Sequence, residues 1–248
     1  MLKAAYLNEA EKLVLHKKYL VFLLLDVGFC LFYVLSRVLA GHFADSTFGG
    51  VDLFGDVMVG GLSVYLLFFL PLIALLGASD LFSSEYHDLS LRMLFLRPVE
   101  RWKLFFAKTA AVFSLCFVFL AVHFAALLLL KLIFSHSLQG VLFAAEAYFL
   151  DLFPLLVVVL FFGFFQQLVR SSGSAVALSA VVYVIIVCIG RYVSLAGGLV
   201  FTEFLSWHGL WLGSTLPMGA LMPKIGILLG TGIVFYCAGL ELFDRKEI

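Results

Sequence analysis

The stretch LFFAKTAAVFSLCFVFLAVHFAALLLL, residues Leu104–Leu130, contains a single charged side chain, Lys108. A helix needs about 20 mostly apolar residues to cross the hydrocarbon core of a bilayer, so this stretch is long enough to do so. Its apolar residues are continuous and do not alternate with polar ones, which argues against a strand of a membrane β-barrel. The stretch therefore predicts a membrane-spanning helix.

Five further stretches meet the same criterion. Together the six predicted spans are Tyr19–Leu39, Val57–Ala78, Leu104–Leu130, Val141–Val169, Ala175–Val200 and Ile225–Phe243. The first span is too long for a cleaved signal peptide, and no small-residue cleavage site leads from it into a polar mature region. We therefore expect an all-α integral membrane protein, with residues 1–248 forming one transmembrane domain.

The composition of the whole chain agrees with this fold class. Of the 248 residues, 64% are hydrophobic and 13% are charged, whereas a soluble domain has about 45–50% apolar and about 25% charged residues. These proportions exclude a soluble enzyme or binding module. The 16 basic residues are balanced by 16 acidic ones, so no excess positive charge is available to bind nucleic acid.

The basic residues predict the orientation in the membrane. Eleven of the 16 Lys and Arg residues fall in the N-terminal segment, between spans 2 and 3, between spans 4 and 5, or at the C-terminus, and a twelfth, Lys108, lies just inside span 3 on the same side. Loops rich in Lys and Arg stay on the cytoplasmic side. With an even number of spans, both termini are expected in the cytoplasm, and the chain is expected in the cell membrane.

Two segments outside the spans are also predicted to be helical. In residues 1–18, apolar side chains recur at helical spacing between charged ones, which predicts an amphipathic helix lying on the inner membrane surface. Phe201–Pro223 is apolar and aromatic, and it contains Pro217 and Pro223. This composition favours a re-entrant dip into the outer leaflet over a solvated loop, since such backbone must be covered by protein.

No catalytic motif occurs in the sequence. The chain lacks the metalloprotease, serine-hydrolase, Walker and dinucleotide-binding patterns, so we expect no catalytic residue and no bound cofactor. The four cysteines are far apart and form no C-x-x-C pair, so their spacing indicates neither a zinc site nor a disulfide. Only one of the six histidines, His123, lies within a span, and we expect no metal site, although one assembled in three dimensions stays open.

Four of the charged residues inside the spans are candidates for a transport pathway, because burying them in a bilayer is costly. They are Asp26 in span 1, Glu146 and Asp151 in span 4, and Arg191 in span 5. They could line a translocation path or carry protons. Alternatively, they could form structural ion pairs, or their ends could reach the outer interface.

The segment between spans 2 and 3 has the densest charge. Residues 79–108 read SDLFSSEYHDLSLRMLFLRPVERWKLFFAK, which predicts a short helix, a second amphipathic piece and a turn at Pro98. Such a segment offers charge and shape to a cytoplasmic partner.

This segment resembles the signature of ABC-2 type permeases, the membrane subunits of ATP-driven exporters. The family pattern after span 2 is E-x-E-R-G-T-L-E-x-L-L-x-x-P-[VI]-x-R, followed by a Lys in span 3. The residues that match this pattern are Glu85, Leu91, Leu94, Phe95, Pro98, Val99, Arg101 and Lys108. The chain departs from it at His87, Asp88, Leu89 and Arg92.

The resemblance implies a permease that pairs with a second, identical or related permease and rests on two copies of a separate cytoplasmic ATPase. ATP and Mg²⁺ would bind to that partner and not to this chain. The segment from Asp80 to Asp88 would dock into the ATPase, with Asp80, Glu85 and Asp88 pairing with basic residues and Leu81 and Phe82 filling an apolar pocket. Cargoes of the family include lipids, peptides and antibiotics.

Two other functions stay open on sequence grounds. One is an ion-coupled secondary transporter that uses Asp26, Glu146, Asp151 and Arg191; such folds often contain internal repeats, and the two halves of this chain show no convincing repeat. The other is a membrane scaffold or immunity protein that sequesters a partner.

Overall fold

In a computed structural model of the chain, the described residues are 2–44, 57–85, 100–136, 138–169, 171–193, 198–212 and 218–245. These residues form helices and connecting turns, and no strand occurs among them. Six helical stretches in them are long and apolar enough to cross a membrane. The all-α membrane fold predicted from the sequence is thus confirmed.

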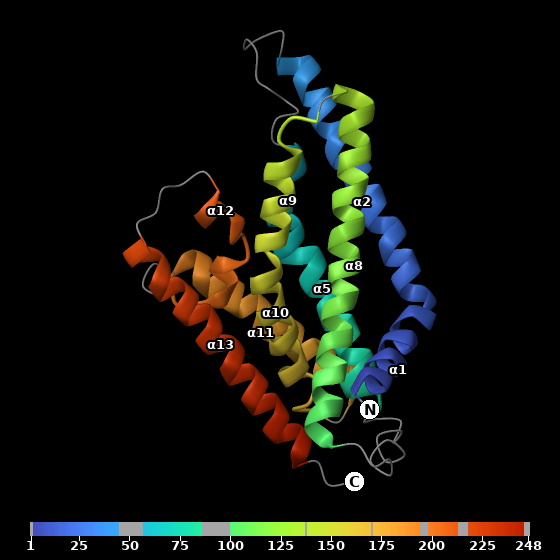
Figure 1. Ribbon diagram of the computed structural model, residues 1–248, viewed down its shortest axis with the longest axis vertical. Helices are drawn as coiled ribbons and strands as arrows, with labels where there is room; N and C mark the ends of the chain where they lie inside the picture. The colour runs from blue at the N-terminus through green and yellow to red at the C-terminus, as the bar shows by residue number, and fades with distance from the viewer. Residues whose placement is uncertain are drawn as a thin grey trace.

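Five of the six candidate spans lie close to the predicted apolar stretches, whereas the fifth ends at Tyr192, before the predicted end at Val200. The six spans are Lys17–Leu39, Val57–Ser84, Arg101–Ser135, Val141–Phe165, Ser172–Tyr192 and Gly219–Asp244. The corresponding elements are α2 (Lys17–Ala44), the series α3 to η2, α8 (Arg101–Ser135), α9 (Val141–Leu150) with α10 (Leu152–Phe165), α11 (Ser172–Tyr192) and α13 (Met218–Asp244). In Figure 1, both chain ends lie at the lower end of the molecule, as an even number of spans requires.

The N-terminal helix α1 (Leu2–Leu15) is separate from α2. The chain turns at His16, whose amide donates to the carbonyl of Leu13. α1 packs mainly against the lower end of α8 (Figure 1), and it buries Leu13 and Glu9. The amphipathic segment predicted for residues 1–18 is therefore a helix whose inward face packs on protein.

The second span is an irregular helix. It consists of α3 (Val57–Gly60), α4 (Leu62–Val64), η1 (Tyr65–Phe69), α5 (Leu70–Ala78) and η2 (Ser79–Ser84). Both η1 and η2 are π-helical. Such turns are rare and occur frequently at functional sites, because the extra residue in the turn changes where the neighbouring side chains point. In this chain, each π-helical turn contributes a polar side chain to a cluster described below.

The centre of the molecule is α10, which packs against α5 and α13. The chain breaks between α9 and α10 at Asp151, and Pro154 lies in the first turn of α10, where its missing N–H removes no helical hydrogen bond. Phe161 and Phe162 are buried and contact one another edge to face. Much of the phenylalanine in this sequence therefore fills the protein core rather than facing lipid.

The segment after α11 folds back onto the helices. It contains the short helices η3 (Phe201–Phe204) and α12 (His208–Trp211), which contact α11 and α9 respectively. Phe201, Phe204 and Trp207 are buried. α13 then begins at Met218 and continues through Pro223, so the last helix starts before the predicted span Ile225–Phe243.

Candidate functional site

Lys108, in the lower part of α8, has a side chain that is 0% exposed. Its Nζ lies 3.0 Å from Glu9 Oε2 and 2.6 Å from Glu85 Oε2, and it donates to the carbonyl of Leu81 at 2.9 Å. One buried cation thus connects α1, the end of the second span and α8. Because a buried charge is costly unless it is paired and hydrogen-bonded, all three acceptors are needed at this position.

Two further lysines extend this arrangement, which we call the charge cluster: Glu9, Lys12, Lys18, Asp80, Glu85 and Lys108. Lys12 Nζ lies 3.0 Å from Glu9 Oε1 and 2.7 Å from Glu85 Oε1. Lys18 Nζ lies 2.5 Å from Asp80 Oδ1, and the hydroxyl of Tyr19 donates to Asp80 Oδ2. Asp80, near the end of the second span, and Glu85, which directly follows that span, are therefore both paired with the N-terminal region of the same chain.

The carboxylates of Glu85 and Glu9 raise the pKa of Lys12. Partial burial by itself would lower the pKa of Lys12, but the hydrogen bonds and negative charges of Glu85 and Glu9 outweigh burial. The pKa of Lys12 is consequently raised above its usual value of 10.5. Lys12 is thus a cation throughout the physiological pH range.

The structure describes four of the five residues predicted to dock on an ATPase. Asp80 and Glu85 are paired within the chain, and the side chains of Leu81 and Phe82 are each 1% exposed. The ring of Phe82 packs against those of Phe105 and Phe243. The fifth, Asp88, lies outside the described residues, so the docking role of this segment stays a prediction.

A second polar cluster lies within the spans, where α2, η1 and α8 meet. Asp26 is 0% exposed, and its Oδ1 lies 2.8 Å from Nδ1 of His123. The hydroxyl of Tyr65 donates to Asp26 Oδ2 at 3.1 Å, and Sγ of Cys30 lies 3.3 Å from His123 Nδ1. We call these four residues the intramembrane cluster.

Aspartate also holds the folded-back segment in place. The carboxylate of Asp151 accepts from the backbone amide of His208 at 2.8 Å and lies 2.6 Å from its Nδ1. Asp151 stands at the break between α9 and α10, so one buried carboxylate connects this break to the start of α12. Its contacts anchor the residues 198–212 to the fourth span.

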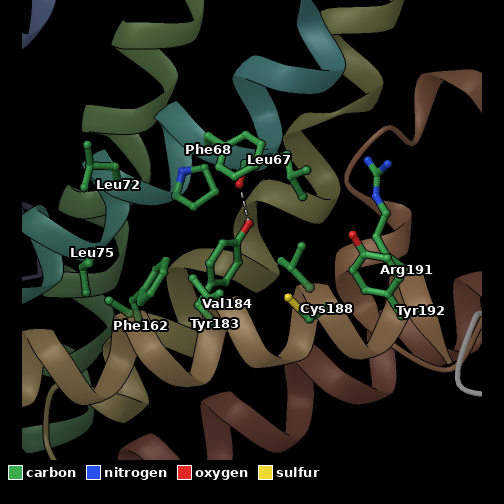
Figure 2. Close-up of a pocket in the computed structure, with 13 residues that line it drawn as sticks. Leu67, Phe68, Leu72, Leu75, Phe162, Tyr183, Val184, Cys188, Arg191 and Tyr192 are labelled. Atoms are coloured by element: carbon green, nitrogen blue, oxygen red, sulfur yellow. Dashed lines mark hydrogen bonds between the residues drawn. The ribbon is translucent and has the colours of Figure 1, made fainter.

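A groove between the second and fifth spans has a volume of about 470 Å³. Figure 2 shows its apolar walls, formed mainly by leucine, valine and aromatic side chains of η1, α5 and α11. The hydroxyl of Tyr183 points across it and donates to the carbonyl of Leu67 at 2.8 Å. Arg191 and Tyr192 lie together near one end of the groove, so its lining combines a long apolar surface with a cation.

The four charges predicted to form a pathway do not form one cluster in the described part of the chain. Asp26 pairs with His123 and Asp151 pairs with His208. Glu146 and Arg191 are exposed, and Arg191 lines the groove. The residues that sequence reasoning missed are the partners Glu9, Tyr65, His123 and His208, of which only His123 gave a signal, as the one histidine in a predicted span.

Comparison with known families completes the description of the site. A family model described as ABC-2 family transporter protein matches residues 9–190, which is more than half of the chain. A search of curated protein sequences finds no match. The matched range includes the charge cluster, the intramembrane cluster and most of the groove.

Proposed function

Since this chain belongs to the ABC-2 family of transporter proteins, we propose that it is the permease subunit of an ATP-driven exporter in the cell membrane. Membrane proteins of this family work with ABC ATPases and are transport components. In this proposal, a separate cytoplasmic ATPase drives this chain and a second permease subunit. The ATPase is present in two copies and binds ATP and Mg²⁺. Both termini are then cytoplasmic, and the chain itself is not catalytic.

The position of Lys108 supports the proposed coupling between the ATPase and the membrane spans. Lys108 binds Glu85, the last described residue of the Asp80–Asp88 segment that is expected to contact the ATPase, and it also binds Glu9 on α1. A displacement of that segment would therefore move α1 and α8 together. In this proposal, the charge cluster transmits motion within the permease, and the contact surface for the ATPase lies further along the cytoplasmic segment.

The groove in Figure 2 supports an amphipathic cargo. Its walls are apolar along η1, α5 and α11, while Arg191 provides a cation near one end. An apolar pocket with a few oriented polar groups is typical of a ligand site. A lipid-like, peptide or antibiotic cargo with an apolar body and a polar or anionic group matches this lining.

The test is reconstitution. The chain is co-expressed with candidate ABC ATPases, purified through a tag on the permease, and placed in liposomes. We expect a cytoplasmic ATPase to co-purify in a 1:1 ratio of chains, as two copies of each, and ATP hydrolysis to rise when an amphipathic cargo is added. Transport by the purified chain alone, driven by an ion gradient, would contradict the proposal.

A further inference from the structure

The intramembrane cluster brings together three metal-ligating atoms that sequence spacing does not connect. A carboxylate oxygen of Asp26, Sγ of Cys30 and a ring nitrogen of His123 all lie within 4.8 Å of one another. Asp26 and Cys30 are one helical turn apart on α2, and His123 faces them from α8. All three side chains are buried, with exposures of 0%, 0% and 1%.

Hydrogen bonding alone leaves this arrangement incompletely satisfied. Nδ1 of His123 is approached by Asp26 Oδ1 at 2.8 Å and by Cys30 Sγ at 3.3 Å, and a ring nitrogen carries at most one proton. If the Nδ1 proton points at the carboxylate, the Cys30 thiol has no partner in the ring. The thiol can then donate only to the His123 carbonyl oxygen, which lies 4.0 Å from Sγ, and this hydrogen bond is weak. A cation between the three atoms would bond to all of them.

The neighbouring aromatic rings fix the histidine. Tyr65 stacks on the imidazole of His123, with ring centroids 3.7 Å apart and planes 17° apart, and Phe29 lies on the same ring at 6.3 Å. The hydroxyl of Tyr65 also donates to Asp26 Oδ2, which orients the carboxylate. Partners of this kind, which hold ligands in place, are a regular feature of metal sites.

The charge of the three ligands favours a divalent cation. In a low-dielectric interior an unbalanced charge is strongly unfavourable. The carboxylate of Asp26 and the thiolate of Cys30 carry two negative charges together, while a neutral imidazole carries none. A divalent cation bound to these three groups gives a site with no net charge.

We propose that Asp26, Cys30 and His123 bind one divalent transition-metal ion of the zinc type within the membrane-spanning region. Thiolate and imidazole ligands favour zinc over magnesium or calcium, which prefer oxygen. Zinc bonds to sulfur at about 2.3 Å and to nitrogen or oxygen at about 2.0–2.2 Å. Such bonds require ligand separations of roughly 3–4 Å, so small side-chain adjustments suffice.

Binding changes the protonation of the cluster in a defined way. Cys30 loses its thiol proton to solvent, and the neutral imidazole of His123 carries its one proton on Nε2, so Nδ1 is free to bond the cation. Nε2 is buried and has no hydrogen-bond partner among the described residues. Starting from a neutral imidazole, one proton is released for each cation bound.

The test measures metal content directly and does not depend on the proposed transport function. The chain is produced in zinc-supplemented medium with an affinity tag that contains no histidine, purified in detergent, and analysed by elemental mass spectrometry. We expect about one zinc per chain, and about a tenth of that in Cys30→Ser and Asp26→Asn. Growth with cobalt should give a thiolate-to-cobalt charge-transfer absorption that is absent in Cys30→Ser.

Cys116→Ser is the matched control. Cys116, in α8, is fully buried like Cys30, but it lies outside the intramembrane cluster. It should retain the wild-type zinc content and the cobalt absorption. If the wild-type chain contains no more zinc than Cys30→Ser and gives no charge-transfer absorption, the proposal is wrong. The cluster is then a hydrogen-bonded pair of Asp26 and His123.

Discussion

Lys108 Nζ and Glu85 Oε2 lie 2.6 Å apart, although the two residues are 23 positions apart in the chain and the lysine is completely buried. Glu9 completes the pair from the N-terminal helix, at 3.0 Å. This relationship makes the lower end of the molecule a single connected unit.

Replacing Lys108 by Met should destabilise the protein strongly. Without Lys108, the two carboxylates of Glu9 and Glu85 share the single cation of Lys12, and breaking a buried ion pair costs about 3–5 kcal/mol. Lys108→Met should therefore lower the unfolding temperature in detergent well below that of the wild type. Lys131→Met is the control on the same helix. The buried Lys131 donates to the backbone carbonyl of Gln139, and among the described contacts its removal leaves no carboxylate without a cation. Equal losses in the two variants would contradict this account of Lys108.

The raised pKa of Lys12 predicts a pH dependence of stability. A cation whose pKa is higher in the folded state stabilises that state fully below its unfolded pKa, and the stabilisation is lost as the pH rises through the folded pKa. The contribution of Lys12 should therefore be constant at neutral pH and decline above 10.5. The measurement compares unfolding midpoints of the wild type and Lys12→Met from about pH 9 to about pH 12. A gap between them that stays constant over that range would contradict the raised pKa.

Asp151→Asn should loosen the folded-back segment. The amide side chain can still accept from the backbone of His208 but loses the charged contact to Nδ1, which is worth about 1.5–3 kcal/mol. In a background without the native cysteines, Ser206→Cys should react faster with a membrane-impermeant maleimide when Asp151 is replaced. Glu146→Gln, a change at an exposed carboxylate of the same span, should leave the labelling rate unchanged. Equal rates in the Asp151→Asn and wild-type backgrounds would show that Asp151 does not anchor the segment.

Arg191→Gln should weaken the response to cargoes that carry an anionic group. The loss of one charge-assisted contact corresponds to about a tenfold change in the cargo concentration that half-stimulates ATP hydrolysis. Arg191→Lys should retain most of the response because it keeps the charge. Lys224→Gln serves as the control, since Lys224 does not line the groove. An unchanged half-stimulating concentration for Arg191→Gln would remove Arg191 from the cargo site.

The spans were predictable from sequence because a bilayer imposes one simple requirement, a long run of apolar residues. The clusters were not, because their members are far apart in the chain: Glu9 and Lys108 are 99 positions apart, and Asp26 and His123 are 97 apart. Which helices bring such residues together depends on packing, and a single sequence does not reveal it. Asp26 was recognised as unusual only because a lone carboxylate in a span is costly.

The surroundings of Leu81 and Phe82 show a second limit. Both residues were expected on a surface that meets an ATPase, and both are buried. The ring of Phe82 packs against Phe105 of α8 and Phe243 of α13. In a membrane protein, apolar side chains face lipid, partner subunits and the core alike, so hydrophobicity does not distinguish these faces. The π-helical turn at Ser79–Ser84 also changes the register of the helix at this point, and no periodic pattern in the sequence announces it.

The most direct test of coupling through the charge cluster uses Glu85→Gln. This change keeps the shape of the side chain but removes the charge that pairs with Lys12 and Lys108. The control is Glu241→Gln, which removes an exposed carboxylate paired only locally with Arg245 among the described contacts. The quantity measured in liposomes is the amount of cargo transported per ATP hydrolysed by the complex with its ATPase. We predict that this ratio falls severalfold in Glu85→Gln while complex assembly and basal hydrolysis persist, and that Glu241→Gln behaves like the wild type. A wild-type ratio in Glu85→Gln would contradict the account.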